Sequence, residues 1–172
     1  MQAIAIVLIS ILAAVIYGVL HDQVTARVCV EYFTVGHPPI FRTDDPTLLG
    51  IGWGIIATWW AGPLLGGPLA VVARAGARQK RSAKSLIRPI AMLMGVNAVC
   101  ALIAGGIGWL RAGRGVDSLS PWMAALVPAK EHASFIADYY AHLTGYSVGF
   151  LGGLVVLAIV WRSRIAAAST LT

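Results

Sequence analysis

The sequence is poor in charge and in cysteine. Charged side chains make up 12% of its 172 residues, whereas soluble domains carry about 25%. Hydrophobic residues make up 58%, and the mean hydropathy is +0.78. This composition excludes an ordinary soluble globular domain. The two cysteines, Cys29 and Cys100, are too few for a disulfide framework or a zinc site built on thiolates.

Several familiar sequence motifs are also missing. The chain contains no P-loop, no Rossmann glycine fingerprint and no His-Glu-x-x-His zinc motif. Its net charge of +6 and pI near 9.8 would favour nucleic acid as the partner of a soluble protein. In so apolar a chain we expect anionic lipid, and no nucleic acid, as the partner.

Long apolar stretches are what the sequence does have. A helix crosses the roughly 30 Å hydrocarbon core of a bilayer with about 20 apolar residues. Four stretches meet this requirement, at residues 3–20, 47–72, 89–110 and 140–161. Because no basic residue precedes the first stretch, we interpret it as a retained anchor. The sequence therefore predicts an all-α integral membrane protein, with residues 1–172 forming one membrane domain of four transmembrane helices.

Local signals mark the ends of these helices. Asp45 and Pro46 are typical of a helix start, because a carboxylate accepts from free amides and proline fits the first turn. We interpret Pro89 in the same way for the third helix. Pro63 and Pro68 lie inside the second span, where they predict a bend.

Basic residues are distributed unevenly between the segments that join the spans. One side has Arg74, Arg78, Lys80, Arg81, Lys84 and Arg88 in the loop 74–88, with Arg162 and Arg164 after the fourth span. The other side has Arg27, Arg42, Arg111, Arg114 and Lys130. The positive-inside rule predicts that both termini and the loop are cytoplasmic, an N-in/C-in topology. The six basic residues of the loop are then expected to contact anionic lipid.

Two extracytoplasmic segments, residues 21–46 and 111–132, would cover the outer end of the bundle. In the second, Ser120 and Pro121 predict the start of a short helix that ends before Pro128. In the first, aromatic and β-branched residues leave two alternatives open, a short hairpin or a segment packed over the bundle. Every aspartate, glutamate and histidine falls on this side of the predicted topology.

The fourth span is predicted to extend outward as one long helix from near Glu131, since neither glycine nor proline interrupts residues 129–144. One face of this helix carries, in order, Glu131, Asp138, His142, Gly145, Gly149 and Gly153. The glycines form a small-xxx-small pattern that allows another helix to pack closely. The alternative is chance, in a chain with 19 glycines.

A metal site is the sharpest chemical prediction. His21 follows the first span, and His142 lies at the same depth on the fourth helix. The candidate ligands are His21, Asp22, Asp138 and His142, with Glu131 or His37 completing the set. Such nitrogen and oxygen ligands suit a divalent transition metal. The alternatives are interfacial hydrogen-bonding groups without a metal, and, less favoured, a haem held by His21 and His142.

Three functions remain open at this stage. The first is a non-catalytic accessory or structural membrane subunit, whose glycine face packs in the bundle, against another membrane protein or against a second copy. The second is a metal-binding or metal-dependent hydrolytic site at the extracytoplasmic membrane face. The third is a small transporter component, for which only Pro63 and Pro68 give a hint of broken helices.

Part of the chain resembles a known family. The segment His21-Asp22-Gln23-Val24-Thr25, the segment Glu31-Tyr32-Phe33-Thr34 and the later Gly52-Trp53-Gly54 are similar to a family of uncharacterised bacterial multi-spanning membrane proteins. The resemblance covers the first two spans and the loop between them. It implies a bacterial inner-membrane location, and it implies no activity, substrate or site.

Overall fold

The computed structural model describes residues 1–169, with side chains up to residue 165. Its elements are α1 (Gln2–Val28), α2 (Val30–Thr34), α3 (Pro46–Ile56), α4 (Ala61–Arg74), α5 (Ala83–Gly113), α6 (Pro121–Leu126), the short 3-10 helix η1 (Ala129–Glu131) and α7 (His132–Ser169). Within residues 1–169 there is no strand. The all-α prediction is confirmed, and the hairpin alternative for the first loop is wrong.

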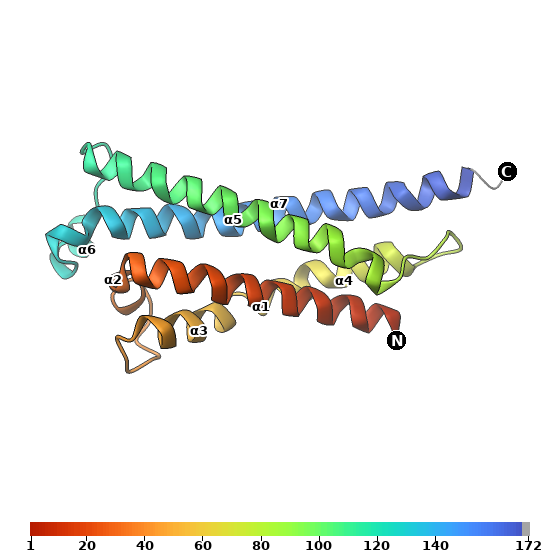
Figure 1. Ribbon diagram of the computed structural model, residues 1–172, viewed down its shortest axis with the longest axis horizontal. Helices are drawn as coiled ribbons and strands as arrows, with labels where there is room; N and C mark the ends of the chain where they lie inside the picture. The colour runs from red at the N-terminus through yellow and green to blue at the C-terminus, as the bar shows by residue number, and fades with distance from the viewer. Residues whose placement is uncertain (170–172) are drawn as a thin grey trace.

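Four helical segments are long and apolar enough to cross a membrane: Gln2–Val28, Pro46–Arg74, Ala83–Gly113 and Ala129–Ile165. The predicted number of spans is therefore confirmed, although every segment is longer than its apolar run. Figure 1 shows the helices aligned along one axis, with α2 and α6 at one end. The N-terminus, the α4–α5 loop and the C-terminal end of α7 lie at the other end.

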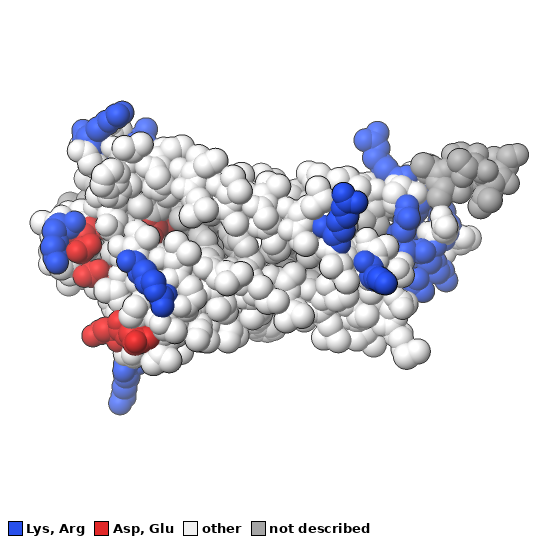
Figure 2. All heavy atoms as spheres, in the orientation of Figure 1, with Lys and Arg blue, Asp and Glu red and all other residues white. Residues whose placement is uncertain are grey.

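The bundle consists of two helix pairs: the first and second spans form one pair, and the third and fourth spans form the other. α1 packs along α3 and α4, and α5 packs along α7, while contacts of α1 with α5 and of α4 with α7 join the pairs. Figure 2 shows Lys and Arg at both ends of the molecule, whereas Asp and Glu are seen only at the α2 and α6 end. The apolar middle of this face fits a bilayer core.

α1 continues two turns beyond His21, so the connecting segment begins at Cys29 and not at residue 21. The apolar run of α1 ends here at polar side chains. These side chains form hydrogen bonds to α3. Gln23 donates to the Thr47 carbonyl (2.9 Å), and Arg27 donates to the Thr47 hydroxyl (2.8 Å). Side-chain hydrogen bonds to α3 thus hold this part of α1 beyond the end of its apolar run.

The second span is two helices, because residues 57–60 form a turn between α3 and α4. Asp45 caps α3 as predicted, since its Oδ1 accepts from the Thr47 and Leu48 amides at 2.9 Å. The break precedes Pro63, which falls in the first turn of α4. Proline has no amide hydrogen to donate and fits best there, so Pro63 restarts the helix and does not bend it.

The third helix begins earlier than predicted. α5 starts at Ala83, with Ser82 as its cap, so Pro89 is an interior residue and not a helix start. The Ser82 hydroxyl accepts from the Ser85 amide, which supplies the N-terminal signal that we assigned to Pro89. The non-helical part of the basic loop shrinks accordingly to residues 75–82.

At the other end of the molecule, α6 forms where Ser120 and Pro121 predict it, although Ser120 makes no side-chain cap. α7 begins at His132, directly after the 3-10 turn that contains Glu131. The prediction of one long helix from near Glu131 is confirmed, and its outward direction stays a prediction.

Candidate metal centre and adjoining cavity

His21 and His142 meet between α1 and α7. Their ring centroids are 4.6 Å apart and the ring planes are nearly perpendicular, at 79°. His21 also stacks on Tyr17, one turn earlier on α1. His21 directly follows the apolar run and still belongs to α1. The two rings are too close for a haem to fit between them.

Asp22 faces His142 in an arrangement that lacks a hydrogen donor. The Nδ1–H of His142 donates to the Asp138 carbonyl at 2.8 Å, so Nε2 of the neutral ring carries a lone pair. This Nε2 lies 3.3 Å from Asp22 Oδ1. Two acceptors at this distance repel unless a proton or a cation lies between them.

The three side chains are close enough to share one ion. One ligand atom from each of His21, Asp22 and His142 lies within 4.8 Å of the others. Two ligands of one zinc ion lie at most about 4 Å apart, so small side-chain movements would close the site. Asp22 is only 4% exposed. The sequence-based grouping of these three residues is thus found in the structure.

Asp138, which we predicted as a fourth ligand, is not among the three residues whose ligand atoms lie within 4.8 Å of one another, and it is 1% exposed. Its carbonyl orients His142, and its carboxylate Oδ2 is buried without a hydrogen-bond partner. Nε2 of His21 and Nε2 of His142 are also buried without partners. Buried polar atoms are normally hydrogen-bonded, so three orphans in one place require an explanation.

His37 approaches from the first loop. Its Nδ1–H donates to the Tyr32 carbonyl at 2.8 Å, which leaves Nε2 free in the same way as in His142. The ring lies between Phe33 and Trp53, at 5.5 and 4.6 Å. Burial in this aromatic setting lowers the pKa of His37. His37 is a neighbour of the three-residue group and not a member of it.

Glu131 belongs to a different cluster, which corrects our prediction. Its carboxylate lies with Cys29 and Glu31, within 4.8 Å of one another. The Cys29 thiol donates to Glu31 at 3.5 Å, and burial raises its pKa to about 12. A protonated thiol is a poor metal ligand. Glu131 does not join the predicted ligands because η1 turns the chain just before α7 begins.

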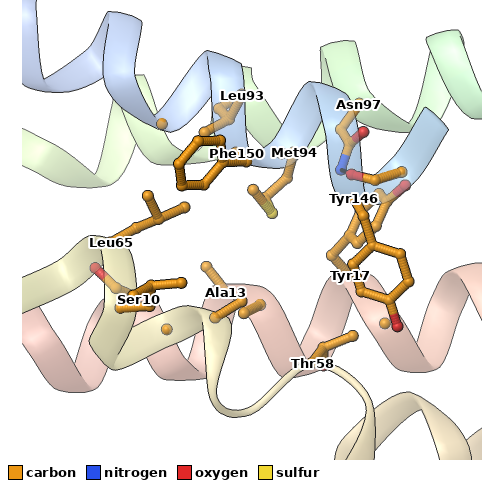
Figure 3. Close-up of a pocket in the computed structure, with 18 of the residues that line it drawn as sticks. Ser10, Ala13, Tyr17, Thr58, Leu65, Leu93, Met94, Asn97, Tyr146 and Phe150 are labelled. Atoms are coloured by element: carbon orange, nitrogen blue, oxygen red, sulfur yellow. Dashed lines mark hydrogen bonds between the residues drawn. The ribbon is translucent and has the colours of Figure 1, made fainter. Parts of the chain in front are cut away.

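An apolar cavity of about 480 Å³ opens beside the metal candidate. It lies between the two helix pairs, and α1, α4, α5 and α7 all line it. Figure 3 shows Leu65, Leu93 and Phe150 at one end, and Asn97 and Tyr17 at the other. His21, Asp22 and His142 also line this cavity.

The predicted glycine face of α7 lines this cavity as well. A Cβ at Gly145 would meet the Tyr17 hydroxyl at 3.4 Å, and one at Gly149 would meet Asn97 Nδ2 at 3.3 Å. At Gly153 the neighbour is the Leu65 side chain, at 2.7 Å. The glycines therefore make room for side chains of other helices and not for the backbone of a packed helix.

Residues 145–149 also have the Gly-x-Ser-x-Gly spacing of a nucleophile elbow, which needs a turn between a strand and a helix. Here the serine lies inside α7. Its hydroxyl donates to the Leu143 carbonyl at 2.8 Å on an exposed face. The local structure excludes an elbow.

The basic end contains one residue whose role the sequence did not reveal. Arg164 is fully buried and donates to the carbonyls of Val72, Ala75, Arg78 and Gln79. It therefore caps the C-terminal end of α4. Periodicity could not separate it from Arg162, which is exposed two residues earlier.

Comparison with family models, with curated proteins and with solved structures finds no match for this chain. The resemblance to a bacterial membrane family stays a prediction.

Proposed function

We propose that the protein is a membrane protein that binds a divalent transition metal through His21, Asp22 and His142. The observation that carries this proposal is the pair of acceptors, His142 Nε2 and Asp22 Oδ1, that face each other at 3.3 Å. A metal ion between them would accept both lone pairs.

A shared proton would also join these two atoms, but it would leave other atoms unexplained. His21 Nε2 and Asp138 Oδ2 are buried and have no partner. A single ion can take up His21 Nε2 together with His142 Nε2 and Asp22 Oδ1. The Asp138 carbonyl that holds His142 Nδ1–H is the type of second-shell contact that fixes metal-ligating histidines.

Three protein ligands leave one position of a tetrahedral ion for water. This position would face the cavity, since all three ligands line it. A water bound to zinc has a pKa near 7, so the hydrolytic form of the proposal needs no further base.

Metal analysis of the purified protein tests the proposal. After chelator treatment and reloading with zinc, we expect about one ion per chain. Exchange of His142 for alanine should abolish binding, and exchange of Asp22 for asparagine should weaken it about 10- to 100-fold, as for other metal-site contacts. His132→Ala is the matched control, because His132 lies on the same helix, belongs to neither candidate cluster and hydrogen-bonds to the Val127 carbonyl. Equal zinc content in the wild type and in His142→Ala would contradict the proposal.

We further propose an N-in/C-in topology in a bacterial inner membrane. Support comes from the basic end, where Arg78, Lys80, Lys84 and Arg88 are exposed and can contact anionic lipid. Arg74 and Arg81 are less available, because Arg74 donates to the Arg81 carbonyl and Arg81 donates to Ser163.

A transporter component is a second candidate, and the break at residues 57–60 favours it. Interrupted helices beside a cavity are typical of transporters. Zinc uptake into proteoliposomes would support this candidate, whereas zinc binding without uptake would contradict it. The accessory-subunit hypothesis stays a prediction, and the α7 glycines, which face side chains of the other helices, fit its version in which this face packs in the bundle.

A further inference from the structure

The cavity has a polar end and an apolar end. At the polar end, three buried atoms lack hydrogen-bond partners: the Tyr17 hydroxyl, Asn97 Oδ1 and His21 Nε2. Asn97 is 2% exposed and belongs to the cavity wall. Figure 3 shows Asn97 and Tyr17 on the same side of the opening, away from Leu65 and Leu93.

The amide of Asn97 has a fixed orientation. Its Nδ2 donates to the Gly145 carbonyl of α7 at 3.0 Å, so Oδ1 must be the free atom. A buried amide oxygen without a donor costs free energy. A ligand that occupies the cavity would remove this cost by donating a hydrogen bond.

Tyr17 and Asn97 lie over consecutive turns of α7. The Tyr17 hydroxyl is next to Gly145, and Asn97 Nδ2 is next to Gly149. One hydroxyl group placed between them could accept from Tyr17 and donate to Asn97 Oδ1.

Charge restricts the ligand further. No lysine or arginine lines the cavity, while the carboxylate of Asp22 does. A phosphate or carboxylate head would therefore meet a like charge and no cation. The cavity volume of about 480 Å³ falls within the roughly 300–1,000 Å³ of small-molecule sites.

We propose that this cavity binds a neutral single-chain lipid alcohol, with its hydroxyl between Tyr17 and Asn97 and its chain along Leu65, Leu93 and Phe150. The proposal goes beyond metal binding and does not require it, because neither Tyr17 nor Asn97 is a metal candidate. It also gives the α7 glycines a role, since side chains there would occupy the space of the ligand.

Photolabelling of the purified, chelator-treated protein tests the proposal. The probe is hexadecanol with a diazirine in the middle of its chain, and mass spectrometry locates the label. We expect label near Leu93 and Phe150, and competition by hexadecanol. The methyl ether of hexadecanol cannot donate to Asn97, so it should compete about 5- to 10-fold less well. Palmitate and phosphatidylcholine should compete even less.

Two variants separate ligand recognition from general lipid contact. Ala13 points into the cavity (Figure 3), and Ala13→Phe should reduce labelling about tenfold by filling it. Ala91→Phe is the control, because Ala91 is exposed on α5. Asn97→Ala should remove the preference for the alcohol over the ether, with the melting temperature measured to verify folding.

Equal competition by alcohol and ether in the wild type would contradict the proposal, as would equal competition by palmitate. So would labelling that Ala13→Phe leaves unchanged. Repeating the assay with zinc keeps the two proposals apart, since labelling without zinc binding would contradict only the metal site. Zinc binding without labelling would contradict only the lipid site.

Discussion

Arg164 shows how a single side chain can organise one end of the bundle. Its Nε and Nη2 donate to Gln79 and Ala75 at 2.8 and 2.7 Å. These carbonyls follow the last turn of α4, where the helix has free acceptors and a negative dipole. A buried cation is tolerated here because every donor group has a partner.

We predict that Arg164→Ala lowers the free energy of unfolding by about 3 kcal/mol or more, because several buried carbonyls lose a charged donor. Arg162→Ala should change it by less than about 0.5 kcal/mol, since Arg162 is exposed. Denaturant unfolding in mixed micelles measures both. Equal effects of the two variants would contradict the capping role.

Asp117 provides a test of the α6 end. Arg111 donates to both of its oxygens, at 2.7 and 2.9 Å, and the Tyr140 hydroxyl donates at 2.7 Å. These hydrogen bonds, Arg111 first, lower the pKa of Asp117 to about 2. Its stabilising contribution is therefore present above the ordinary value near 3.8 and is lost as the pH falls towards 2.

We predict that Tyr140→Phe raises the pKa of Asp117 towards its ordinary value, because one donor to the carboxylate is removed. Carbon NMR titration of labelled aspartate measures this shift, and Tyr139→Phe is the control on the same helix. An unchanged pKa in Tyr140→Phe would show that the hydroxyl does not bond the charged form.

At the scale of elements, the close packing of the second span against α1 depends on glycine. A Cβ at Gly54 would lie 2.5 Å from Val19 Cα and 2.6 Å from Val19 N. Both are backbone atoms, which cannot move aside as a flexible side chain can. Glycine thus brings the first two spans together at their backbones, whereas the predicted glycines Gly145, Gly149 and Gly153 of α7 meet side chains.

We predict that Gly54→Ala destabilises the protein by about 1–3 kcal/mol, as overpacking of a core does. Gly67→Ala is the control, because nothing lies within 4 Å of its added Cβ. That variant should be neutral or stabilise α4 by up to about 1 kcal/mol. Equal melting temperatures of the two variants would contradict the close contact between Gly54 and α1.

Sequence patterns predicted elements better than their ends. Hydropathy identified four spans, and Asp45 and Pro46 marked the start of α3. The end of α1 was missed because hydropathy stops at His21, while Gln23 and Arg27 continue the helix through hydrogen bonds to Thr47. Such long-range bonds leave no periodic signal in a single sequence.

The metal candidate was predicted only in part. Helix depth and spacing related His21, Asp22 and His142, since depth along a straight helix follows from residue count. Glu131 was misplaced because the η1 turn changes the direction of the chain. The cavity was not predicted, because it depends on how two helix pairs face each other.

At the scale of the whole molecule, the topology is open to a direct test. Cys29 is a poor reporter because it is 2% exposed and burial raises its pKa to about 12. Ser118 and Ser82 are exposed at opposite ends, so each can be exchanged for cysteine in the wild-type background. In intact cells we predict labelling of Ser118→Cys by an impermeant maleimide and none of Ser82→Cys. The reverse pattern would invert the topology.

The proposed metal centre connects the residue, the element and the molecule, because α1 and α7 would each supply a histidine to a site in the cavity wall. X-ray absorption of the zinc-loaded protein tests this most directly. We predict a first shell of nitrogen and oxygen at about 2.0–2.1 Å, with imidazole scattering. A sulfur shell at about 2.3 Å would place the ion at Cys29 instead and would contradict the site at His21, Asp22 and His142.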